Sequence, residues 1–215
     1  MTRLIGVYGV GGCGRGIMPL VRAMPDAANA WLVFIDDSPE QTEVNGHAVM
    51  TFADFCADPI PQKAVALAIS TGTIRARLAE QCAEAGIPLV AVRANDVVEM
   101  DNVELGEGAL ISPFVTFTSN IRVGRCFHAN LYSCIEHDAV IGDFVTFGPG
   151  VRCNGNVTIG DFAYIGSGAL IRQGVTIGAG ATVGMGAVVV KDVPPGITVV
   201  GNPARPLEHG AMADV

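Results

Sequence analysis

The sequence predicts a chain of two parts, an α/β domain followed by a β-solenoid. In roughly the first ninety residues, short apolar runs alternate with stretches of helical character. A glycine-rich loop follows the first of these runs. From Val103 to Asp192 the chain then repeats every six residues, through fifteen blocks without an insertion.

The alternating runs predict a parallel sheet built from βαβ units. We expect strands over Arg3–Tyr8, Trp31–Ile35, Lys63–Ile69 and Pro88–Val92, and helices over Ile17–Met24 and Thr73–Ala85. The expected boundaries are 1–92 for this domain, 93–102 for a linker, 103–193 for the repeat and 194–215 for a C-terminal tail.

Gly9, Gly11 and Gly14 form a G-x-G-x-x-G loop between the first strand and its helix, and Asp36 follows Gly14 by 22 residues. Such glycines let backbone N–H groups approach a phosphate, and an acid after the second strand suits a ribose hydroxyl. About ninety residues make one mononucleotide-binding half, which favours a nucleotide or nucleotide-linked ligand over NAD. The alternative is that these glycines only permit close strand–helix packing.

Composition excludes several classes of function. A nucleic-acid partner would need a basic footprint, and the net charge of −8 argues against one. The sequence has no run of 18 apolar residues and no signal-peptide pattern, so no membrane span is expected. Its six cysteines show no CxxC pairing, which favours reduced thiols in a cytoplasmic protein.

The six-residue repeat predicts short strands joined by turns. Its third position is always apolar, and glycine holds the fourth position in eight of the fifteen blocks. A helix would need a period of about 3.6 residues, so this pattern indicates a solenoid. One block cannot bury its apolar residue alone, and the blocks must therefore stack.

The repeat ends in VVVKDVPPGITVVGNPARPL at Val188–Leu207, and the whole pattern resembles the hexapeptide-repeat acyltransferases. That resemblance implies a left-handed parallel β-helix in which three blocks make one coil. Fifteen blocks would then form about five coils, roughly 24 Å tall at ~4.8 Å per layer. It also implies homotrimers with acetyl-CoA and the active sites lying between subunits.

The block Ser133–Asp138 departs most from the pattern, because it carries Glu136, His137 and Asp138 in its turn. With 18 residues per coil, Gly155 lies directly above His137. A glycine there leaves room for an acyl group and offers an N–H to a developing oxyanion. A neighbouring acid can hold the imidazole tautomer and raise its basicity. The alternative is a solvent-exposed turn histidine.

A metal site is not expected. His128 is the only other histidine of the repeat, and half a coil separates it from His137. A zinc site of the kind that other solenoids build needs three such ligands.

Across its full length the chain is similar to nucleotide-sugar acetyltransferases of the PglD, NeuD and PerB type. The motifs that carry this likeness are Tyr8–Arg15, Asp36-Asp37, Ala68–Ser70, the set Asn130, Glu136, His137 and Asp138, and Gly155–Gly160. The resemblance implies acetyl-CoA-dependent N-acetylation of the 4-amino group of a nucleotide-linked sugar, for surface polysaccharide synthesis. The likeness is greatest to GDP-perosamine N-acetyltransferases, so GDP-perosamine is favoured and a UDP-linked 4-amino sugar is the alternative.

The resemblance also implies roles for individual residues. His137 corresponds to the general base, Asp138 to the acid beside it, and Asn130 to an active-site amide. The implied sugar-nucleotide contacts are Gly11, Gly12, Cys13, Asp36, Asp37, Ser70 and Glu136. The implied acetyl-CoA contacts are Thr146, Gly155, Ser167 and Met185, and charge alone adds Arg172, Lys191 and Arg205.

We expect direct transfer without a covalent intermediate, because no cysteine occupies the polar turn around His137. Two other functions fit the same features. One is O-acetylation of a sugar hydroxyl, as in sialic-acid acetyltransferases, which needs the same base. The other is a non-catalytic nucleotide-binding domain on a trimeric scaffold.

Overall fold

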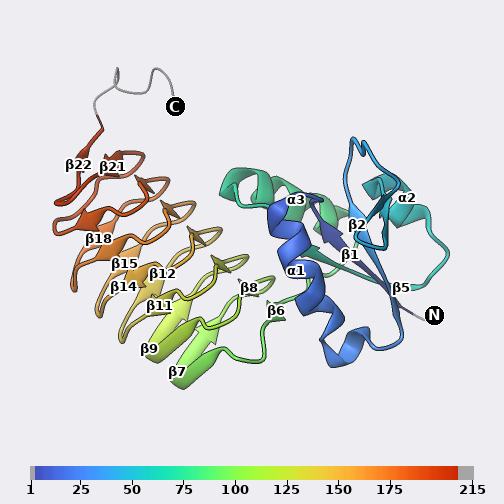
Figure 1. Ribbon diagram of the computed structural model, residues 1–215, viewed down its shortest axis with the longest axis horizontal. Coiled ribbons are helices and arrows are strands. Elements are labelled where there is room, and N and C mark those ends of the chain that lie inside the picture. The colour runs from blue at the N-terminus through green and yellow to red at the C-terminus, as the bar shows by residue number, and fades with distance from the viewer. Residues whose placement is uncertain (1–2, 208–215) are drawn as a thin grey trace. The chain divides into compact units, whose positions relative to one another are not determined.

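The computed structural model describes residues 3–207 and divides into two compact units (Figure 1). Of the described residues, the first unit contains 3–93 together with Glu107–Leu110, and the second contains Ala94–Gly106 and 111–207. The last eight residues of the predicted tail, 208–215, lie outside the described residues. The predicted fold class, an α/β domain followed by a parallel β-helix, is confirmed.

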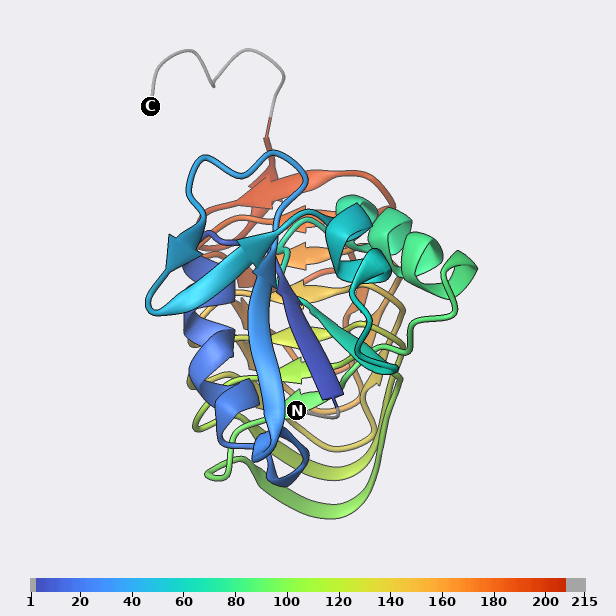
Figure 2. The same ribbon diagram turned by 90° about the vertical axis from the view of Figure 1, so that its right-hand side faces the viewer.

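The first unit is a five-stranded sheet with strand order β3-β4-β2-β1-β5 (Figure 2). β1 lies between β2 and β5 and is parallel to both, whereas β3 and β4 form an antiparallel pair at one edge. The strands are β1 (Arg3–Tyr8), β2 (Ala30–Ile35), β3 (Glu43–Val44), β4 (His47–Met50) and β5 (Gln62–Leu67). The helices are α1 (Gly12–Arg22), α2 (Phe52–Ala57), α3 (Gly72–Glu84) and the short 3-10 helix η1 (Pro25–Ala27).

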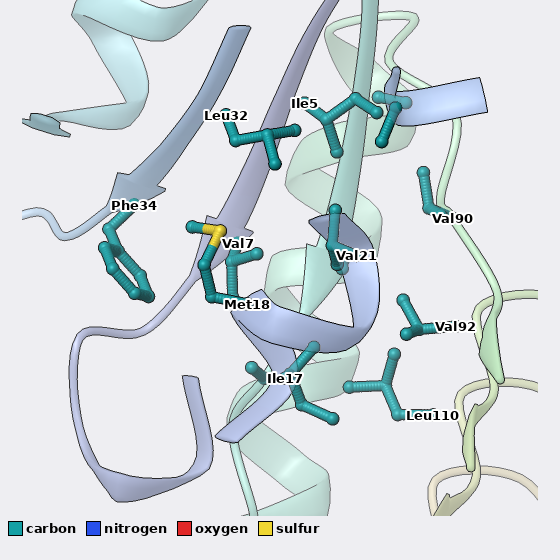
Figure 3. Close-up of a cluster of buried hydrophobic side chains, with 14 residues drawn as sticks. Ile5, Val7, Ile17, Met18, Val21, Leu32, Phe34, Val90, Val92 and Leu110 are labelled. Carbon is teal, nitrogen blue, oxygen red and sulfur yellow. The ribbon is translucent and has the colours of Figure 1, made fainter. Parts of the chain in front are cut away.

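An aliphatic core holds α1 against this sheet (Figure 3). Met18 and Val21 of α1 pack with Val7 of β1 and Phe34 of β2, all at most 2% exposed. Gly14 is required where α1 meets β1, because a Cβ there would overlap the carbonyl group of Gly9. The glycine-rich loop therefore permits close packing of the helix on the strand, which was the alternative explanation of its glycines.

The secondary structure differs from the predicted elements in several places. Helix α1 begins at Gly12 rather than Ile17, because the glycines themselves form its first turn. The elements β3, β4 and α2, over residues 43–57, were not predicted, since they are too short to show a period. The segment Pro88–Val92 is not one strand: Leu89 forms an isolated bridge with Val65, and β6 covers only Val92–Arg93.

The second unit is a parallel β-helix whose strands pair at an interval of 18 residues. His128 pairs with Thr146, Cys134 with Arg152 and Val140 with Thr158. One face carries β8 (Leu110–Ile111), β10 (His128–Ala129), β13 (Thr146–Phe147), β16 (Tyr164–Ile165), β19 (Thr182–Val183) and β21 (Thr198–Val200). The next carries β11 (Cys134–Ile135), β14 (Arg152–Cys153), β17 (Leu170–Ile171) and β20 (Val188–Val189). The third carries β12 (Val140–Ile141), β15 (Thr158–Ile159) and β18 (Thr176–Ile177).

The β-helix begins earlier than the predicted boundary. Strand β7 (Val98–Leu105) pairs with β9 (Thr116–Val123) from Val98 to Leu105, so half of the predicted linker 93–102 already belongs to a coil. The six-residue pattern did not reveal this, because Glu99 stands where an inward apolar residue would be expected. At the other end, β22 (Arg205–Pro206) returns antiparallel to β21.

Positive backbone φ angles mark the turns of the β-helix. They recur at an interval of 18 residues, for example at Asn120, Asp138 and Asn156. Asparagine and aspartate tolerate this conformation better than other residues with a side chain. The side chains of Asn120, Asp138 and Asn156 are exposed, so this column of turns is where the β-helix can present polar groups.

Candidate functional site

Each corner of the β-helix stacks the turns of successive coils into a column. We call the column formed by residues 100–102, 118–120, 136–138, 154–156, 172–174 and 190–192 the His137 corner. The Asp143 corner contains 124–126, 142–144, 160–162 and 178–180. The Asn130 corner contains 112–114, 130–132, 148–150, 166–168 and 184–186.

His137 and Asp138 form the chemical centre of the His137 corner. The imidazole Nδ1 lies 2.8 Å from Oδ2 of Asp138, and each side chain is about half exposed. Hydrogen bonds from the side chains of His137 and then Asn120 hold the pKa of the Asp138 carboxyl below its ordinary value. An ionised carboxylate accepts only, so Nδ1 carries the proton and Nε2 presents a lone pair. That is the arrangement of an oriented general base.

Gly155 makes room for this imidazole. A Cβ at position 155 would lie 2.5 Å from Nε2 and 2.5 Å from Cε1 of His137, so the ring sits directly against the glycine backbone. The neighbouring N–H groups are used, since Asn154 donates to Ile171 and Asn156 donates to the carbonyl oxygen of His137. Within residues 3–207 the Gly155 N–H enters no backbone hydrogen bond.

Sequence reasoning missed the residues that hold Asp138. Nδ2 of Asn120 donates to Oδ1 of Asp138 over 3.2 Å, and Nδ2 of Asn102 donates to Oδ1 of Asn120 over 3.0 Å. The 18-residue spacing of Asn102, Asn120 and Asp138 could have identified them, because it places all three at one position on successive coils. The predicted linker boundary hid it, since Asn102 was placed outside the repeat.

Glu136 and Asn130, which were also predicted to belong to the site, occupy different corners of the β-helix. Glu136 is half-buried in the His137 corner, and its N–H donates to the carbonyl oxygen of Cys153. Asn130 lies in the Asn130 corner, where its Nδ2 donates to the carbonyl oxygen of Phe147 over 2.7 Å. Within one chain the structure therefore does not bring Asn130 to His137.

The residues expected to contact acetyl-CoA divide among several parts of the coil. Arg172 and Lys191 are exposed in the His137 corner, on the coils beyond Gly155. Ser167 and Met185 are exposed in the Asn130 corner. Thr146 is buried on β13, and Arg205 is exposed on β22. No single corner contains the whole set.

The cysteines near His137 are poor nucleophiles. Burial raises the pKa of the Cys153 thiol to about 12, and burial followed by the charge of Glu136 also raises the pKa of Cys134. Both thiols therefore stay protonated at neutral pH, and only a thiolate attacks a thioester efficiently. The site offers an imidazole base rather than a thiolate.

In the α/β unit a cavity of about 610 Å³ lies beside the glycine-rich loop. Gly11 and Asp36 line it together with Arg15 and residues 38–41 and 43–45. Gly11 caps α1 without a side-chain hydrogen bond, and the first turn of that helix contains no acidic residue. An anionic group is favoured at such a helix N-terminus, and Arg15 adds a cation beside it.

The other α/β-unit residues predicted to hold a nucleotide do not line this cavity. Gly12 is exposed in the first turn of α1, and Cys13 is half-buried, with a pKa raised by burial. The Asp37 carboxylate accepts a hydrogen bond from the Tyr8 hydroxyl over 2.6 Å, which assigns it a structural partner. Ser70 is exposed at the end of the loop after β5.

Arg75 is a further residue that sequence reasoning missed. It is fully buried in α3, and its guanidinium donates to the carbonyl oxygens of Ile69, over 2.7 Å, and Ser70, over 3.2 Å. These bonds fix the loop that carries Ser70. No sequence signal identified it, because a buried arginine inside an ordinary helix has no distinctive spacing.

The described part of the chain contains no cluster of three or more His, Cys, Asp or Glu side chains that could hold a metal ion. Over the same residues no helix combines the length and the apolar character needed to cross a membrane.

Comparison with known proteins supports both units of the chain. The family model described as bacterial transferase hexapeptide (six repeats) matches residues 156–191. The GDP-perosamine N-acetyltransferase of Escherichia coli O157:H7 is 45% identical over 214 residues, which cover 96% of this chain and 97% of that protein.

Two solved structures are similar over nearly the whole chain. WeeI from Acinetobacter baumannii AYE has a TM-score of 0.91 and 48% identity, over 96% of this chain and 100% of its own. The acetyltransferase domain of PglB from Neisseria gonorrhoeae FA1090, solved in complex with acetyl coenzyme A, has a TM-score of 0.88 and 32% identity. That match covers 96% of this chain and 100% of the PglB chain.

Proposed function

This chain belongs to the hexapeptide-repeat nucleotide-sugar N-acetyltransferases, and from that premise we propose that it acetylates the 4-amino group of GDP-perosamine or a closely similar nucleotide-linked sugar. The donor is acetyl-CoA. The observation that carries the proposal is the His137 imidazole, oriented by Asp138 and lying against Gly155.

The chemistry is direct transfer. The 4-amino nitrogen attacks the thioester carbonyl carbon, and a C–N bond forms as the carbonyl oxygen becomes an oxyanion. Nε2 of His137 accepts the proton that the nitrogen must lose, while Asp138 stabilises the imidazolium. The Gly155 N–H, which enters no backbone hydrogen bond among the described residues, is proposed to donate to the oxyanion. The C–S bond then breaks, and the CoA thiolate takes up the proton from His137.

The donor site is proposed to lie between subunits of a homotrimer. Of the residues assigned to acetyl-CoA, Arg172 and Lys191 lie at one corner of the β-helix and Ser167 and Met185 at another, each pair on successive coils. Two corners of the same coil face different directions, so one bound molecule reaches both sets when the corner of one subunit meets the other corner of its neighbour. Asn130 would then meet the His137 of that neighbour.

The sugar nucleotide is proposed to bind at the cavity beside α1. The N-terminus of the helix and Arg15 suit its diphosphate, and Asp36 suits a ribose hydroxyl. Gly12, Cys13 and Ser70 would complete the contacts around the phosphates, while Asp37 would act through Tyr8. Because acetyl-CoA and nucleotide sugars are made in the cytoplasm, the enzyme is proposed to work there and to need no metal.

Replacing the base tests this assignment most directly. His137→Asn should lower kcat by roughly 10²–10⁴, the range expected for a lost general base. KM for acetyl-CoA should change little, because the imidazole acts on the amine. Steady-state rates with GDP-perosamine and acetyl-CoA measure both constants. Near-normal turnover by this variant would contradict the assignment.

The acceptor can be tested by competition among substrates. GDP-, UDP- and dTDP-linked 4-amino sugars should be acetylated with the GDP-linked sugar preferred, and the matching 4-hydroxy sugars should not react. Transfer of labelled acetyl groups to a hydroxyl would favour O-acetylation instead. Absence of acetyl-CoA binding by calorimetry would favour a non-catalytic scaffold.

A further inference from the structure

Three residues of the His137 corner form a ladder of side-chain hydrogen bonds. Asn102, Asn120 and Asp138 occupy one turn position on successive coils, with φ angles of 52°, 57° and 59°. Asn102 donates to Asn120 over 3.0 Å, and Asn120 donates to Asp138 over 3.2 Å. Asp138 accepts from His137 with its other oxygen over 2.8 Å. The Asn102–Asn120–Asp138 ladder thus ends on the imidazole.

The chemistry of these groups sets the direction of the ladder. An ionised carboxylate has no donor, so Asn120 must turn its Nδ2 toward Asp138. Its Oδ1 then faces away along the coil axis and needs a donor. Nδ2 of Asn102 supplies that donor. A residue at position 102 without a donor would therefore favour the wrong orientation of the Asn120 amide.

The Asp138 carboxylate needs this support because it lies on the surface. Its side chain is 47% exposed, and water competes for both of its oxygens. A turn with positive φ holds the backbone of each residue, but it leaves the side-chain torsions free. The bond from Asn120 leaves Oδ2 as the oxygen that meets the imidazole.

We propose that Asn120 is a positioning residue for the acetyl transfer, and that Asn102 supports it from one coil further away. Asn120 holds the Asp138 carboxylate toward Nδ1 of His137, which keeps the lone pair on Nε2 for the amine proton. Asn102 keeps the amide of Asn120 in the donating orientation. This inference rests on the proposed function, because it assumes that His137 is the base.

Two variants of Asn120 test the first step. Asn120→Gly removes the amide and suits the positive φ, so the turn keeps its conformation. Asn120→Asp keeps the shape but replaces the donor by an acceptor. Both should lower kcat by roughly tenfold, less than removal of the base itself, with KM for both substrates little changed.

The pH profile and the imidazole tautomer separate positioning from a loss of structure. In Asn120→Gly the acid limb of kcat/KM should move to lower pH, because a loosely held Asp138 stabilises the imidazolium less. In Asn120→Asp the added negative charge should move it to higher pH. By 15N NMR of His137, the Nδ1–H tautomer should be less populated in the glycine variant.

Asn102→Asp tests the second step, and Met100→Asp is its matched control. Asn102→Asp should lower kcat by roughly fivefold, the effect of one neutral hydrogen bond, and should have no further effect in the Asn120→Gly background. Met100 is 62% exposed two residues earlier on β7, so Met100→Asp adds the same charge outside the ladder. It should leave kcat unchanged.

The outcomes distinguish this inference from the proposed function. Wild-type rates and pH profiles in both Asn120 variants, with an inactive His137→Asn, would overturn the ladder and leave the base assignment intact. A fully active His137→Asn would overturn both. Additive effects of Asn102→Asp and Asn120→Gly would overturn the supporting role of Asn102, and unchanged melting temperatures would confirm that every variant folds.

Discussion

Two corners of the same β-helix use carboxylates in opposite ways. At the Asp143 corner, Asp143 accepts from the N–H of Arg125 over 2.9 Å, and Asp161 accepts from the N–H of Asp143 over 2.8 Å. At the His137 corner, Asp138 accepts from the side chains of His137 and Asn120. An aspartate that repeats every 18 residues is therefore not by itself a sign of function. Its partner decides whether it joins coils, as Asp143 does, or orients an imidazole, as Asp138 does.

At both corners a glycine leaves room for a side chain of a neighbouring coil, but that side chain differs. Gly142 admits the carboxylate of Asp161, which a Cβ would overlap, and Gly155 admits the imidazole of His137. At one corner the admitted carboxylate accepts a hydrogen bond from the N–H of Asp143. At the other it leaves a basic nitrogen next to the space where substrates would react. Replacing Gly142 should therefore affect stability, and replacing Gly155 should affect activity.

Replacing these glycines should show the largest contrast. Gly155→Ala should lower kcat by roughly 10², because the new Cβ displaces the base from its position. Its melting temperature should change little, since the displaced ring is already half exposed. Gly142→Ala should instead lower the free energy of unfolding by about 2 kcal/mol, through the lost carboxylate–N–H bond. Kinetics and chemical denaturation of both variants measure this, and a stability loss confined to Gly155→Ala would contradict the comparison.

Replacing the aspartates should give a smaller contrast of the same kind. Asp138→Asn should lower kcat by roughly 10–10², because a neutral amide neither selects the Nδ1–H tautomer nor stabilises the imidazolium. Asp143→Asn keeps an acceptor for the N–H of Arg125, so its activity should be unchanged and its stability lower by about 1 kcal/mol. Equal kinetic effects in the two variants would show that carboxylates matter here only for the fold.

The pH dependence of Asp138 should follow from its hydrogen bonds. Its pKa is lowered by the bonds from His137 and Asn120, so the carboxyl should titrate below about 3.9, the ordinary aspartate value. The stabilisation that accompanies this shift is present above that ordinary value and is lost as the pH falls through the lower pKa of the folded state. Carboxyl 13C NMR should show this midpoint, and Asn120→Gly should move it upward. A midpoint above the ordinary value in the wild type would contradict the pairing.

Replacing Cys134, the cysteine nearest to His137 in the sequence, should have the smallest effect. Cys134 stays protonated at neutral pH because burial raises its pKa. Cys134→Ser should therefore retain kcat within about twofold, as expected for a residue outside the reaction. Initial-rate patterns should show a ternary complex rather than ping-pong kinetics. An acetylated cysteine found by mass spectrometry after brief exposure to acetyl-CoA would contradict direct transfer.

Much of the β-helix could be predicted because residues that are 18 positions apart in the sequence become neighbours on successive coils. The 18-residue interval placed Gly155 against His137, and the structure shows the imidazole on that glycine. The same counting failed at Glu99, where a polar residue interrupts the apolar pattern although β7 keeps its register. Backbone pairing tolerates such a residue on the first coil, so the limit of the repeat was not visible in the sequence.

The α/β unit was predicted less completely, because its contacts are not periodic. The spacing of Gly9, Gly11, Gly14 and Asp36 located the loop beside the cavity. It did not reveal Arg75, whose bonds to Ile69 and Ser70 depend on how α3 approaches the loop after β5. Nor did it show that Asp37 is held by Tyr8.

The sequence by itself determined the α/β domain, the β-helix and the stacking of His137 with Gly155. The stacking could be predicted because every coil has nearly the same length, so residues 18 apart in the chain lie on neighbouring coils. Only the tertiary structure decided which polar groups meet. It joined Asp138 to Asn120 and Asn102 and directed the carboxylates of Asp143 and Asp161 to the backbone. Hydrogen-bond partners depend on side-chain torsions, which the repeat does not specify. The stacking of residues in the His137 corner could therefore be predicted, but the hydrogen bonds between them could not.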